Sequence, residues 1–293
     1  MRLANRPIFL AACAAAALFA AVAGCAPQDE SADGANAAGK GQQSCARGKL
    51  ATVRTGRLTV GTDKPAYAPW FADDTPANGK GFESAVAYAV AGELGYGKGA
   101  VDWRTVPFNN AFAPGEKKFD FDINQISVSS ARKKAVAFSS GYYDVRQAVV
   151  ALKDSKAAHA KSVADLKRFR LGAQVGTTSL DVVNDTIRPT QRPAVFQKND
   201  FAKSALKNGQ VDAILTDLPT AFYITSAEIE DAKVVGQFPS TGGTKEQFGL
   251  VLDKESRITG CVSAAVEALR KDGTLAALEK KWLTDAVAVP VLK

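Results

Sequence analysis

The body of the chain alternates short apolar runs with segments of helical periodicity, and this alternation restricts the fold more than any other feature. A strand candidate at 58–61 precedes a helix over 81–94, in which apolar side chains recur at helical spacing. The pattern repeats with a strand at 170–174 and a helix at 177–187. Such alternation predicts parallel sheets with helices on both faces. Further strands are expected at 101–106, 119–123, 194–197 and 211–216, and further helices at 129–135, 201–207 and 256–283.

Two extended apolar segments, 145–152 and 247–252, separate the two series. This layout predicts two α/β lobes joined by two crossing strands. We place 49–148 plus 250–293 in lobe 1 and 149–249 in lobe 2. Ligands of open α/β sheets lie beyond the carboxyl ends of the strands, so the cleft between the lobes is the expected site.

The first 24 residues have the layout of a secretory signal peptide. Arg2 and Arg6 precede an uncharged run from Ile8 to Gly24. The run ends in Val22-Ala23-Gly24-Cys25, which resembles the lipobox of bacterial lipoproteins and implies a lipid on Cys25. We expect residues 25–48 to form the lipidated cysteine and a flexible tether, and the protein to be exported and anchored to the outer face of the cell membrane. The alternative is an unprocessed anchor or a coincidental cysteine.

Removal of Cys13 with the signal peptide and lipidation of Cys25 would leave two thiols, Cys45 and Cys261. In an oxidising compartment such a pair is normally joined. The bridge would close a loop of about 217 residues, for which chain entropy gives at most roughly 5 kcal/mol. Two free thiols used in catalysis or metal binding are the alternative.

Composition excludes several classes of function. With 46% hydrophobic and 23% charged residues, the chain has the composition of a soluble globular protein. Its only histidine is His159, which excludes multi-histidine metal sites. The chain has 37 Lys and Arg residues against 30 Asp and Glu residues, which is a modest excess of positive charge. Lysine-rich stretches such as 153–167 lack aromatic residues on which bases could stack, so no nucleic-acid partner is expected. No cofactor or metal motif is present.

Several short motifs succeed one another in a fixed order along the body of the chain. They are Gly61-Thr62-Asp63, Tyr67-Ala68-Pro69-Trp70, Gly81-Phe82-Glu83, the run from Phe121 to Lys134, Gly176-Thr177-Thr178-Ser179, the run from Val211 to Asp217, and Glu279-Lys280-Lys281-Trp282. In this order and spacing, the sequence from Leu58 to Leu283 resembles the extracytoplasmic solute-binding proteins of ABC importers for polar amino acids. The resemblance implies an α/β, two-lobed, periplasmic-binding-protein-like fold of type II.

A free amino acid presents a carboxylate and an ammonium, and each charge needs a partner when it is buried. A guanidinium can hold a carboxylate with two parallel hydrogen bonds, and Arg132 is the candidate. The alternative is that Arg132 begins a helix and faces water. The resemblance implies that the matching arginine holds the ligand carboxylate, and that hydroxyl and backbone groups at Ser127 and Gln125 help to bind the α-substituents.

On the second lobe, Thr177 and Thr178 open a helix whose amide groups favour an anion. They could equally be ordinary N-cap residues. The resemblance assigns this turn to the same carboxylate, adds Gln174, and assigns Asp217 to the ammonium, with an N-cap role for Asp217 as the alternative.

Aromatic side chains would provide an apolar wall for the ligand. By resemblance these are Tyr67, Trp70 and Phe108, although Trp70 could also belong to the core of the lobe. Asp63 matches a position that contacts a polar or cationic ligand side chain in some members. An extra residue between Asp63 and Tyr67, and Ala85 in place of an acidic residue, depart from the family pattern and leave the side-chain specificity open.

The function expected from this resemblance is a lipid-anchored, monomeric receptor. It would bind a free polar L-amino acid between its closing lobes and deliver it to the permease and ATPase subunits of an ABC importer. One alternative is a sensor module that is not coupled to transport. The other is an enzyme, because similar domains occur as cyclohexadienyl dehydratases and in lytic transglycosylases. Only Asp63 and Glu83 remain for acid–base chemistry, so we expect no enzyme.

Overall fold

The structure is a computed structural model that describes residues 45–46, 49–239, 245–283 and 289–293. The predicted signal peptide, Cys25 and most of the predicted tether lie outside the described residues. Among the described residues, no helix is sufficiently long and apolar to cross a membrane.

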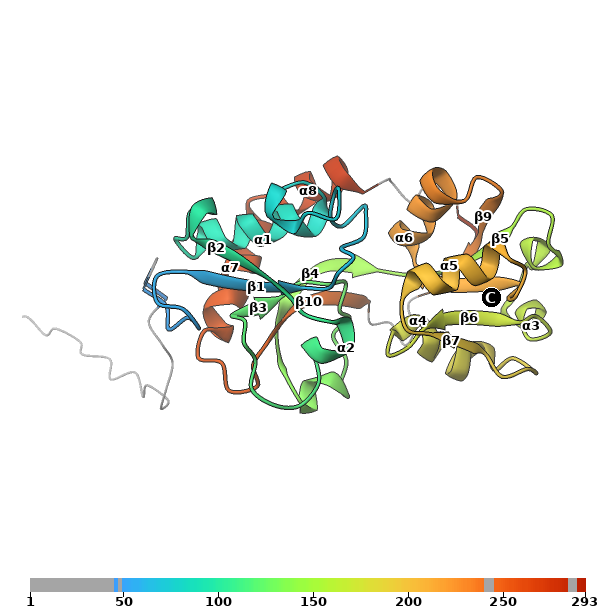
Figure 1. Cartoon of the computed structure of the whole chain (residues 1–293), viewed down its shortest axis with the longest axis horizontal. Helices are drawn as coiled ribbons and strands as arrows, with labels where there is room; N and C mark the ends of the chain where they lie inside the picture. Colours follow the sequence, from blue (N-terminus) through green and yellow to red (C-terminus); the bar gives the residue numbers. More distant parts are fainter. Residues whose placement is uncertain (1–44, 47–48, 240–244, 284–288) are drawn as a thin grey trace, which may run out of the picture. The chain divides into compact units, whose positions relative to one another are not determined.

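The first sheet has the strand order β2-β1-β3-β10-β4. β1 is parallel to β2 and β3, whereas β10 is antiparallel to β3 and β4. Figure 1 shows helices α1 and α8 on one side of this sheet and α2 on the other. The strands are β1 (Leu58–Thr62), β2 (Val101–Thr105), β3 (Phe121–Asp122), β4 (Ala137–Val145) and β10 (Glu246–Leu252). The helices are α1 (Phe82–Glu93), α2 (Phe108–Ala111), α7 (Thr259–Lys271) and α8 (Thr274–Trp282).

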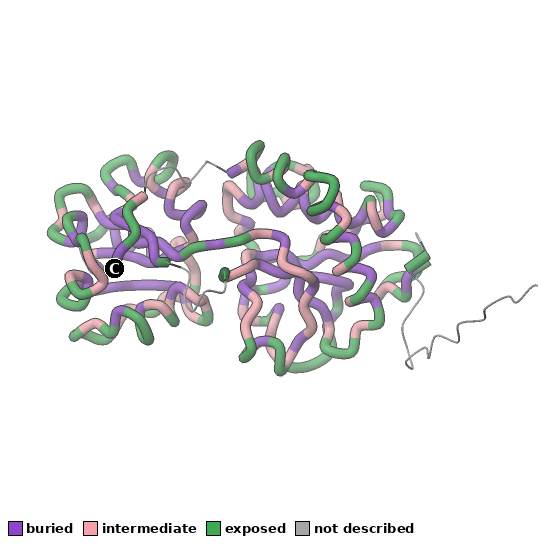
Figure 2. The backbone as a smooth tube through the Cα atoms, turned by 180° about the vertical axis from the view of Figure 1, so that it is seen from behind, coloured by how far each residue is buried: buried purple, intermediate pink, exposed green. Residues whose placement is uncertain are grey.

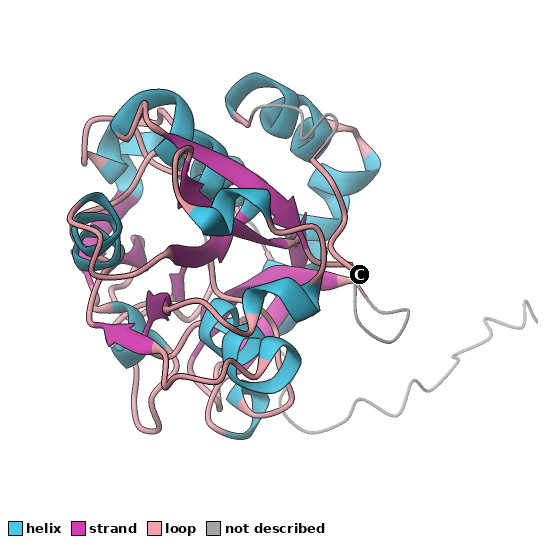
Figure 3. Ribbon diagram, turned by 90° about the vertical axis from the view of Figure 1, so that its right-hand side faces the viewer, coloured by secondary structure: helices cyan, strands magenta, loops and turns pink. Residues whose placement is uncertain are grey.

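The second sheet has the order β7-β6-β8-β5-β9, with β5 antiparallel to β8 and β9. Helices flank its strands on both sides (Figure 1 and Figure 3). The strands are β5 (Gln147–Leu152), β6 (Leu171–Gln174), β7 (Ala194–Phe196), β8 (Ala213–Asp217) and β9 (Ala232–Gln237). The helices are α3 (Val163–Leu166), α4 (Thr178–Asp181), α5 (Asn199–Lys207) and α6 (Leu218–Tyr223).

Short helical turns complete the described structure. Four are 3-10 turns, η1 (Pro76–Asn78), η2 (Lys98–Ala100), η3 (Arg132–Lys134) and η4 (Lys156–His159), and two are π turns, η5 (Val182–Ile187) and η6 (Ile224–Glu228). The helix expected over 129–135 is therefore only the turn η3. The helix expected over 256–283 is two helices, separated at Gly273, where φ is +83°.

Each sheet separates two apolar clusters, because successive side chains of a strand point to opposite faces. In β5, Val149 and Ala151 pack in one cluster, whereas Ala148 and Val150 pack in the other. In β10, Leu250 lies in one cluster and Val251 in the other. The strands are accordingly mostly buried (Figure 2). This double burial explains why both crossing segments are largely apolar in the sequence.

The part of the chain built on the first sheet is lobe 1, and the part built on the second sheet is lobe 2. The chain passes from the first sheet to the second at Arg146 and returns between β9 and β10. These strand assignments differ by a few residues from the boundaries expected at 148/149 and 249/250. The last residues also differ from the expectation, since Val291 pairs with Gln237 of β9 and Leu292 packs in a cluster of lobe 2.

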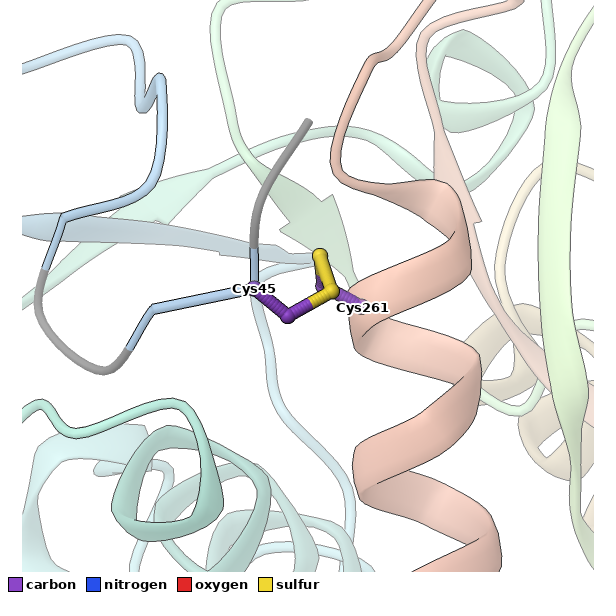
Figure 4. The surroundings of a disulfide bond; sticks show 2 residues. All are labelled: Cys45 and Cys261. Atoms are coloured by element: carbon purple, nitrogen blue, oxygen red, sulfur yellow. A yellow bond between two sulfur atoms is a disulfide. The ribbon is translucent and has the colours of Figure 1, made fainter. Parts of the chain in front are cut away.

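The disulfide expected between Cys45 and Cys261 is present (Figure 4). It joins residues 216 positions apart, with Cα atoms separated by 5.4 Å. Cys261 lies in α7 and is buried in the main cluster of lobe 1. The bridge thus fastens the segment before β1 to the helix that follows the last strand of the first sheet.

Candidate functional site

A small cavity near the strand ends is lined by residues of both lobes. Its volume of about 30 Å³ is far below the roughly 300–1,000 Å³ of typical small-molecule sites, so the two lobes are closely apposed around it. Nine of the expected residues line it, namely Asp63, Tyr67, Phe108, Gln125, Arg132, Gln174, Thr177, Thr178 and Asp217, together with Asn124 and Asn199.

Arg132 is buried in lobe 1 and contacts both lobes. Its Nη1 donates to the carbonyl of Ser127 over 2.6 Å, and its Nη2 donates to the carbonyl of Gly176 in lobe 2 over 2.8 Å. The guanidinium carbon lies 4.4 Å from the ring centre of Phe112. Burial lowers the pKa of Arg132, but a guanidinium stays charged in proteins. The Arg132 side chain is therefore buried and does not face water, contrary to the alternative considered from the sequence.

The turn before α4 faces Arg132 from lobe 2. Thr177 occupies the N-cap position, where its Oγ1 accepts from the Leu180 amide over 3.2 Å and donates to the Gln174 carbonyl over 2.7 Å. Thr177 is thus an N-cap residue that also lines the cavity. Gly176 has φ of +75°, and a Cβ there would lie 2.1 Å from Oδ1 of Asn109 in lobe 1. Only a glycine permits this close approach of the lobes without displacing Asn109.

Asp217 ends β8 and precedes α6 without capping it, since it makes no side-chain capping bond. Its Oδ1 accepts from Nε2 of Gln147 over 2.8 Å. Burial, followed by the charge of Glu246, raises the pKa of Asp217 to about 8. A carboxyl group in this position is ready to ionise when a cation comes into contact with it.

Sequence reasoning missed Gln147 and Glu246, which lie at the beginnings of β5 and β10. Nε2 of Gln147 is 3.2 Å from Oε1 of Glu246 and 3.2 Å from Oγ1 of Thr178. Its Oε1 accepts from Ser179 over 2.5 Å. The available signal was a polar residue near the start of each largely apolar crossing segment, Gln147 within 145–152 and Glu246 directly before 247–252.

Ser127 does not line the cavity, although it was expected to contact the ligand. Its hydroxyl donates to Oε1 of Glu246 over 2.5 Å and lies 3.3 Å from Oγ1 of Thr178. The Ser127 hydroxyl is thus bonded to a side chain of β10 and is not among the lining residues of the cavity.

Asp63 and Tyr67 form part of the lobe 1 wall. Oδ2 of Asp63 accepts from the amide of Phe108 over 3.2 Å, which joins two elements of the wall. The ring of Tyr67 lies 5.3 Å from Nζ of Lys203 in lobe 2. Burial and the nearby charge of Asp200 raise the pKa of Tyr67, so its hydroxyl keeps its proton.

Gln125 is held by the buried carboxyl group of Glu83. The backbone N–H of Gln125 donates to Oε1 of Glu83 over 2.7 Å. The side-chain Nε2 of Gln125 and the hydroxyl of Tyr142 also donate to the Glu83 carboxyl group. Gln125 has φ of +49°, a left-handed conformation unusual for a residue with a side chain. Burial raises the pKa of Glu83 to about 7, against the opposing effect of these hydrogen bonds. Glu83 therefore shapes the cavity wall from behind.

Trp70 is not a wall of the cavity. It is fully buried in the lobe 1 cluster, with its ring edge-on to those of Phe82, Tyr143 and Phe248. Its large ring removes more apolar surface from water in the core than it would at a polar cleft. Of the two interpretations that the sequence left open, the structure supports the core.

The single histidine and the potential metal-ligating side chains are placed as follows in the described part of the chain. His159 lies exposed in η4 and is not a cavity residue. No group of three or more potential metal-ligating side chains occurs among the described residues.

Comparison with known proteins gives a family and a set of relatives. The family model "Bacterial extracellular solute-binding proteins, family 3" matches residues 58–285. The chain is 27% identical over 229 residues to the L-cystine-binding protein TcyJ of Escherichia coli K12, covering 78% of this chain and 82% of that protein.

Solved structures agree with this relationship. An ancestral arginine-binding protein bound to arginine is 30% identical, with a TM-score of 0.63, and the match covers 78% of this chain and 98% of that one. The ancestral amino acid-binding protein AncCDT-1, a precursor of cyclohexadienyl dehydratase, is also 30% identical, with a TM-score of 0.65 and coverage of 78% and 95%.

Proposed function

Because the chain belongs to family 3 of the bacterial extracellular solute-binding proteins, a family of solute receptors, we propose that it binds a free polar L-amino acid between its two lobes. It would deliver this ligand to the permease and ATPase subunits of an ABC importer. The observation that supports this proposal most is the pairing of Arg132 from lobe 1 with Asp217 from lobe 2 around one cavity. A guanidinium and a carboxyl group are the complementary partners of an amino acid's carboxylate and ammonium.

The ligand carboxylate would replace the Ser127 and Gly176 carbonyls as the acceptor for Arg132. It would also meet the amide groups at the start of α4, next to Thr177 and Thr178. The ammonium would replace the Gln147 amide at Asp217. A cation in this place stabilises the ionised carboxylate, so Asp217 would lose its proton as the ligand binds.

The remaining wall defines the class of ligand side chain. Asp63, Tyr67, Asn124 and Asn199 line the cavity, and Arg132 is the one basic residue among its described lining residues. An acidic ligand side chain would meet Asp63 without a second cation to balance it. We therefore propose a neutral polar or cationic side chain, a class that includes the cystine and arginine named for two relatives.

Ligand entry would require the lobes to separate, since the cavity of about 30 Å³ is smaller than any amino acid. Once inside, the ligand would bind partners from both lobes at once, and this differential binding favours the closed form. Transport follows if the importer recognises that form.

The location of the protein is proposed from the sequence alone. Cleavage before Cys25 and lipidation of its thiol would anchor the receptor to the outer face of the cell membrane, where the importer subunits lie. Replacing Cys25 with Ala should move the protein from the detergent phase to the aqueous phase in a phase-partition assay. A protein that partitions identically with and without Cys25 would contradict the anchor while leaving the binding proposal intact.

Calorimetric titration with the twenty amino acids, ornithine, citrulline and cystine tests the binding function. The exported protein is solubilised in detergent and freed of carried-over ligand by unfolding and refolding with the disulfide intact. We expect one or a few polar amino acids to bind, and Arg132→Ala to weaken binding by at least about 100-fold, since two hydrogen bonds to a charged group are lost. Lys133→Ala is the matched control, because Lys133 is exposed beside Arg132. Absence of binding by every amino acid to a native refolded protein would reject the proposal.

A further inference from the structure

The indole of Trp70 joins the two lobes. Its ring packs against lobe 1 residues, with centroid distances of 5.5 Å to Phe248 and 6.0 Å to Phe82. Its Nε1, however, donates to Oγ1 of Thr220 in lobe 2 over 2.9 Å. One side chain is thus anchored in the core of one lobe and hydrogen-bonded to a helix of the other.

Both partners of this hydrogen bond are buried. Trp70 is 0% exposed and Thr220 is 7% exposed. A buried indole N–H without an acceptor costs free energy, because it loses its hydrogen bond to water without replacement. The bond to Thr220 satisfies this donor only while the lobes are together.

Thr220 lies in the first turn of α6, three residues after Asp217. The strand β8 ends at Asp217, and the Leu218 amide donates to the Arg146 carbonyl at the crossing between the lobes over 2.8 Å. Asp217 is directly followed by α6, so its position at the cavity is coupled to the position of the first turn of α6 relative to lobe 1. The Trp70–Thr220 bond joins this turn to the core of lobe 1.

We propose that Trp70 is a positioning residue that acts through Thr220 to place Asp217 at the cavity and to favour the apposed lobes. This inference rests on the proposed function, because Asp217 is the expected partner of the ligand ammonium. Trp70 itself does not touch the cavity, so its effect on binding would be indirect.

The test is a double-mutant cycle with Thr220→Val and Trp70→Phe in the exported, detergent-solubilised protein. L-Arginine and L-cystine are the probes. Thr220→Val keeps the shape of the side chain and removes the acceptor, so we expect the Kd to rise about threefold to tenfold, the usual effect of one hydrogen bond. The double variant should bind no more weakly than Trp70→Phe alone, since both changes remove one bond.

Two further variants separate positioning from general damage. Thr220→Ser retains the hydroxyl and should restore the Kd to within about twofold of the parent protein. Trp103→Phe is the matched control, because Nε1 of Trp103 donates to the hydroxyl of Tyr88 within lobe 1 over 3.1 Å. This variant should leave the Kd unchanged. Parent-like binding by Thr220→Val, or additive effects of the two changes, would overturn the inference.

Hydrogen exchange at the indole N–H groups gives a readout that needs no ligand. With ¹⁵N-labelled tryptophan, the Trp70 signal is assigned by its loss in Trp70→Phe. In Thr220→Val its exchange should accelerate at least about threefold, while exchange at Trp103 should not change. Unchanged exchange at Trp70 overturns the inference. Failure of the parent protein to bind any amino acid instead rejects the proposed function, so the two failures are distinguishable.

Discussion

Nε2 of Gln147 lies 2.8 Å from Oδ1 of Asp217 and 3.2 Å from Oε1 of Glu246. Gln147 and Glu246 begin the two strands that come directly after the crossings between the lobes. An amide nitrogen surrounded by two carboxyl groups and the Thr178 hydroxyl occupies surroundings that would suit an ammonium. Gln147 therefore connects Asp217 to the first residues of both strands. A ligand ammonium that binds Asp217 would compete with Nε2 of Gln147 for its carboxyl group.

Ligand affinity should rise with pH up to about 8. The pKa of Asp217 is about 8 in this structure, so the carboxyl group is protonated at lower pH and must release its proton when an ammonium binds. Below its pKa, the affinity should rise by up to about tenfold per pH unit. Calorimetry at pH 6, 7 and 8 checks this dependence, with Asp217→Asn as the variant that should bind weakly without it. A Kd that is constant over this range would refute the expected proton release.

The stability of the ligand-free protein should fall as pH rises from about 5 to 7, and Glu83 should contribute to this fall. Burial raises the pKa of Glu83 to about 7 from a usual value of 4.5, so between these values the folded state binds more protons than the unfolded state. Its contribution is complete below the unfolded pKa and is lost as pH passes the folded pKa. Urea unfolding at several pH values measures the slope. Glu83→Gln should make the slope shallower, and an identical slope would contradict this cause.

Gly81→Ala should destabilise the protein by roughly 3 kcal/mol or more, because the backbone would have to move. Gly81 has φ of +95°, and a Cβ there would lie 2.5 Å from the Trp70 carbonyl oxygen and 2.6 Å from the Phe71 Cα. Gly97→Ala is the matched control, since Gly97 has φ of −68° and nothing lies within 4 Å of its added Cβ. Urea unfolding of both variants provides the comparison. Equal free energies of unfolding would show that the close contact at Gly81 is relaxed without cost.

Replacing Cys45 and Cys261 together with Ser should lower the free energy of unfolding by about 2–4 kcal/mol, since the bridge closes a long loop. Ligand affinity should stay within about twofold, because neither cysteine lines the cavity. Urea titrations with and without reductant, and calorimetry on the double variant, measure the two quantities. A large loss of affinity at unchanged stability would contradict a structural role for the bridge.

Sequence periodicity was sufficient for the sheets but not for the short helices. The apolar runs at 145–152 and 247–252 predicted the crossing segments because both faces of β5 and β10 are buried. The helix expected over 129–135 is only the turn η3, since β4 begins at Ala137 and the Arg132 side chain is directed into the cavity. Such tertiary constraints override local preference and leave no mark on periodicity.

The cavity residues were predictable where a motif places them at the end of a strand, as with Asp63 and Asp217. Gln147 and Glu246, which are not lining residues of the cavity, were missed because their roles come from contacts with each other, 99 positions apart. Trp70 was left open between the cavity wall and the core, and its ring lies in the core. Composition and spacing do not reveal whether a side chain beside the cavity points into the cavity or into the core of the lobe.

The docking of the last residues on β9 affects how the molecule could be divided into modules. Leu292 lies so close to Gly236 that a Cβ there would be 2.6 Å from its Cγ, and the Val163 amide donates to the Lys293 carbonyl over 3.1 Å. Lobe 2 is therefore assembled from two separate stretches of the gene product. A recombinant fragment spanning only 147–237 would lack part of its own apolar core, and grafting this lobe onto a related receptor would require transferring residues 289–293 with it.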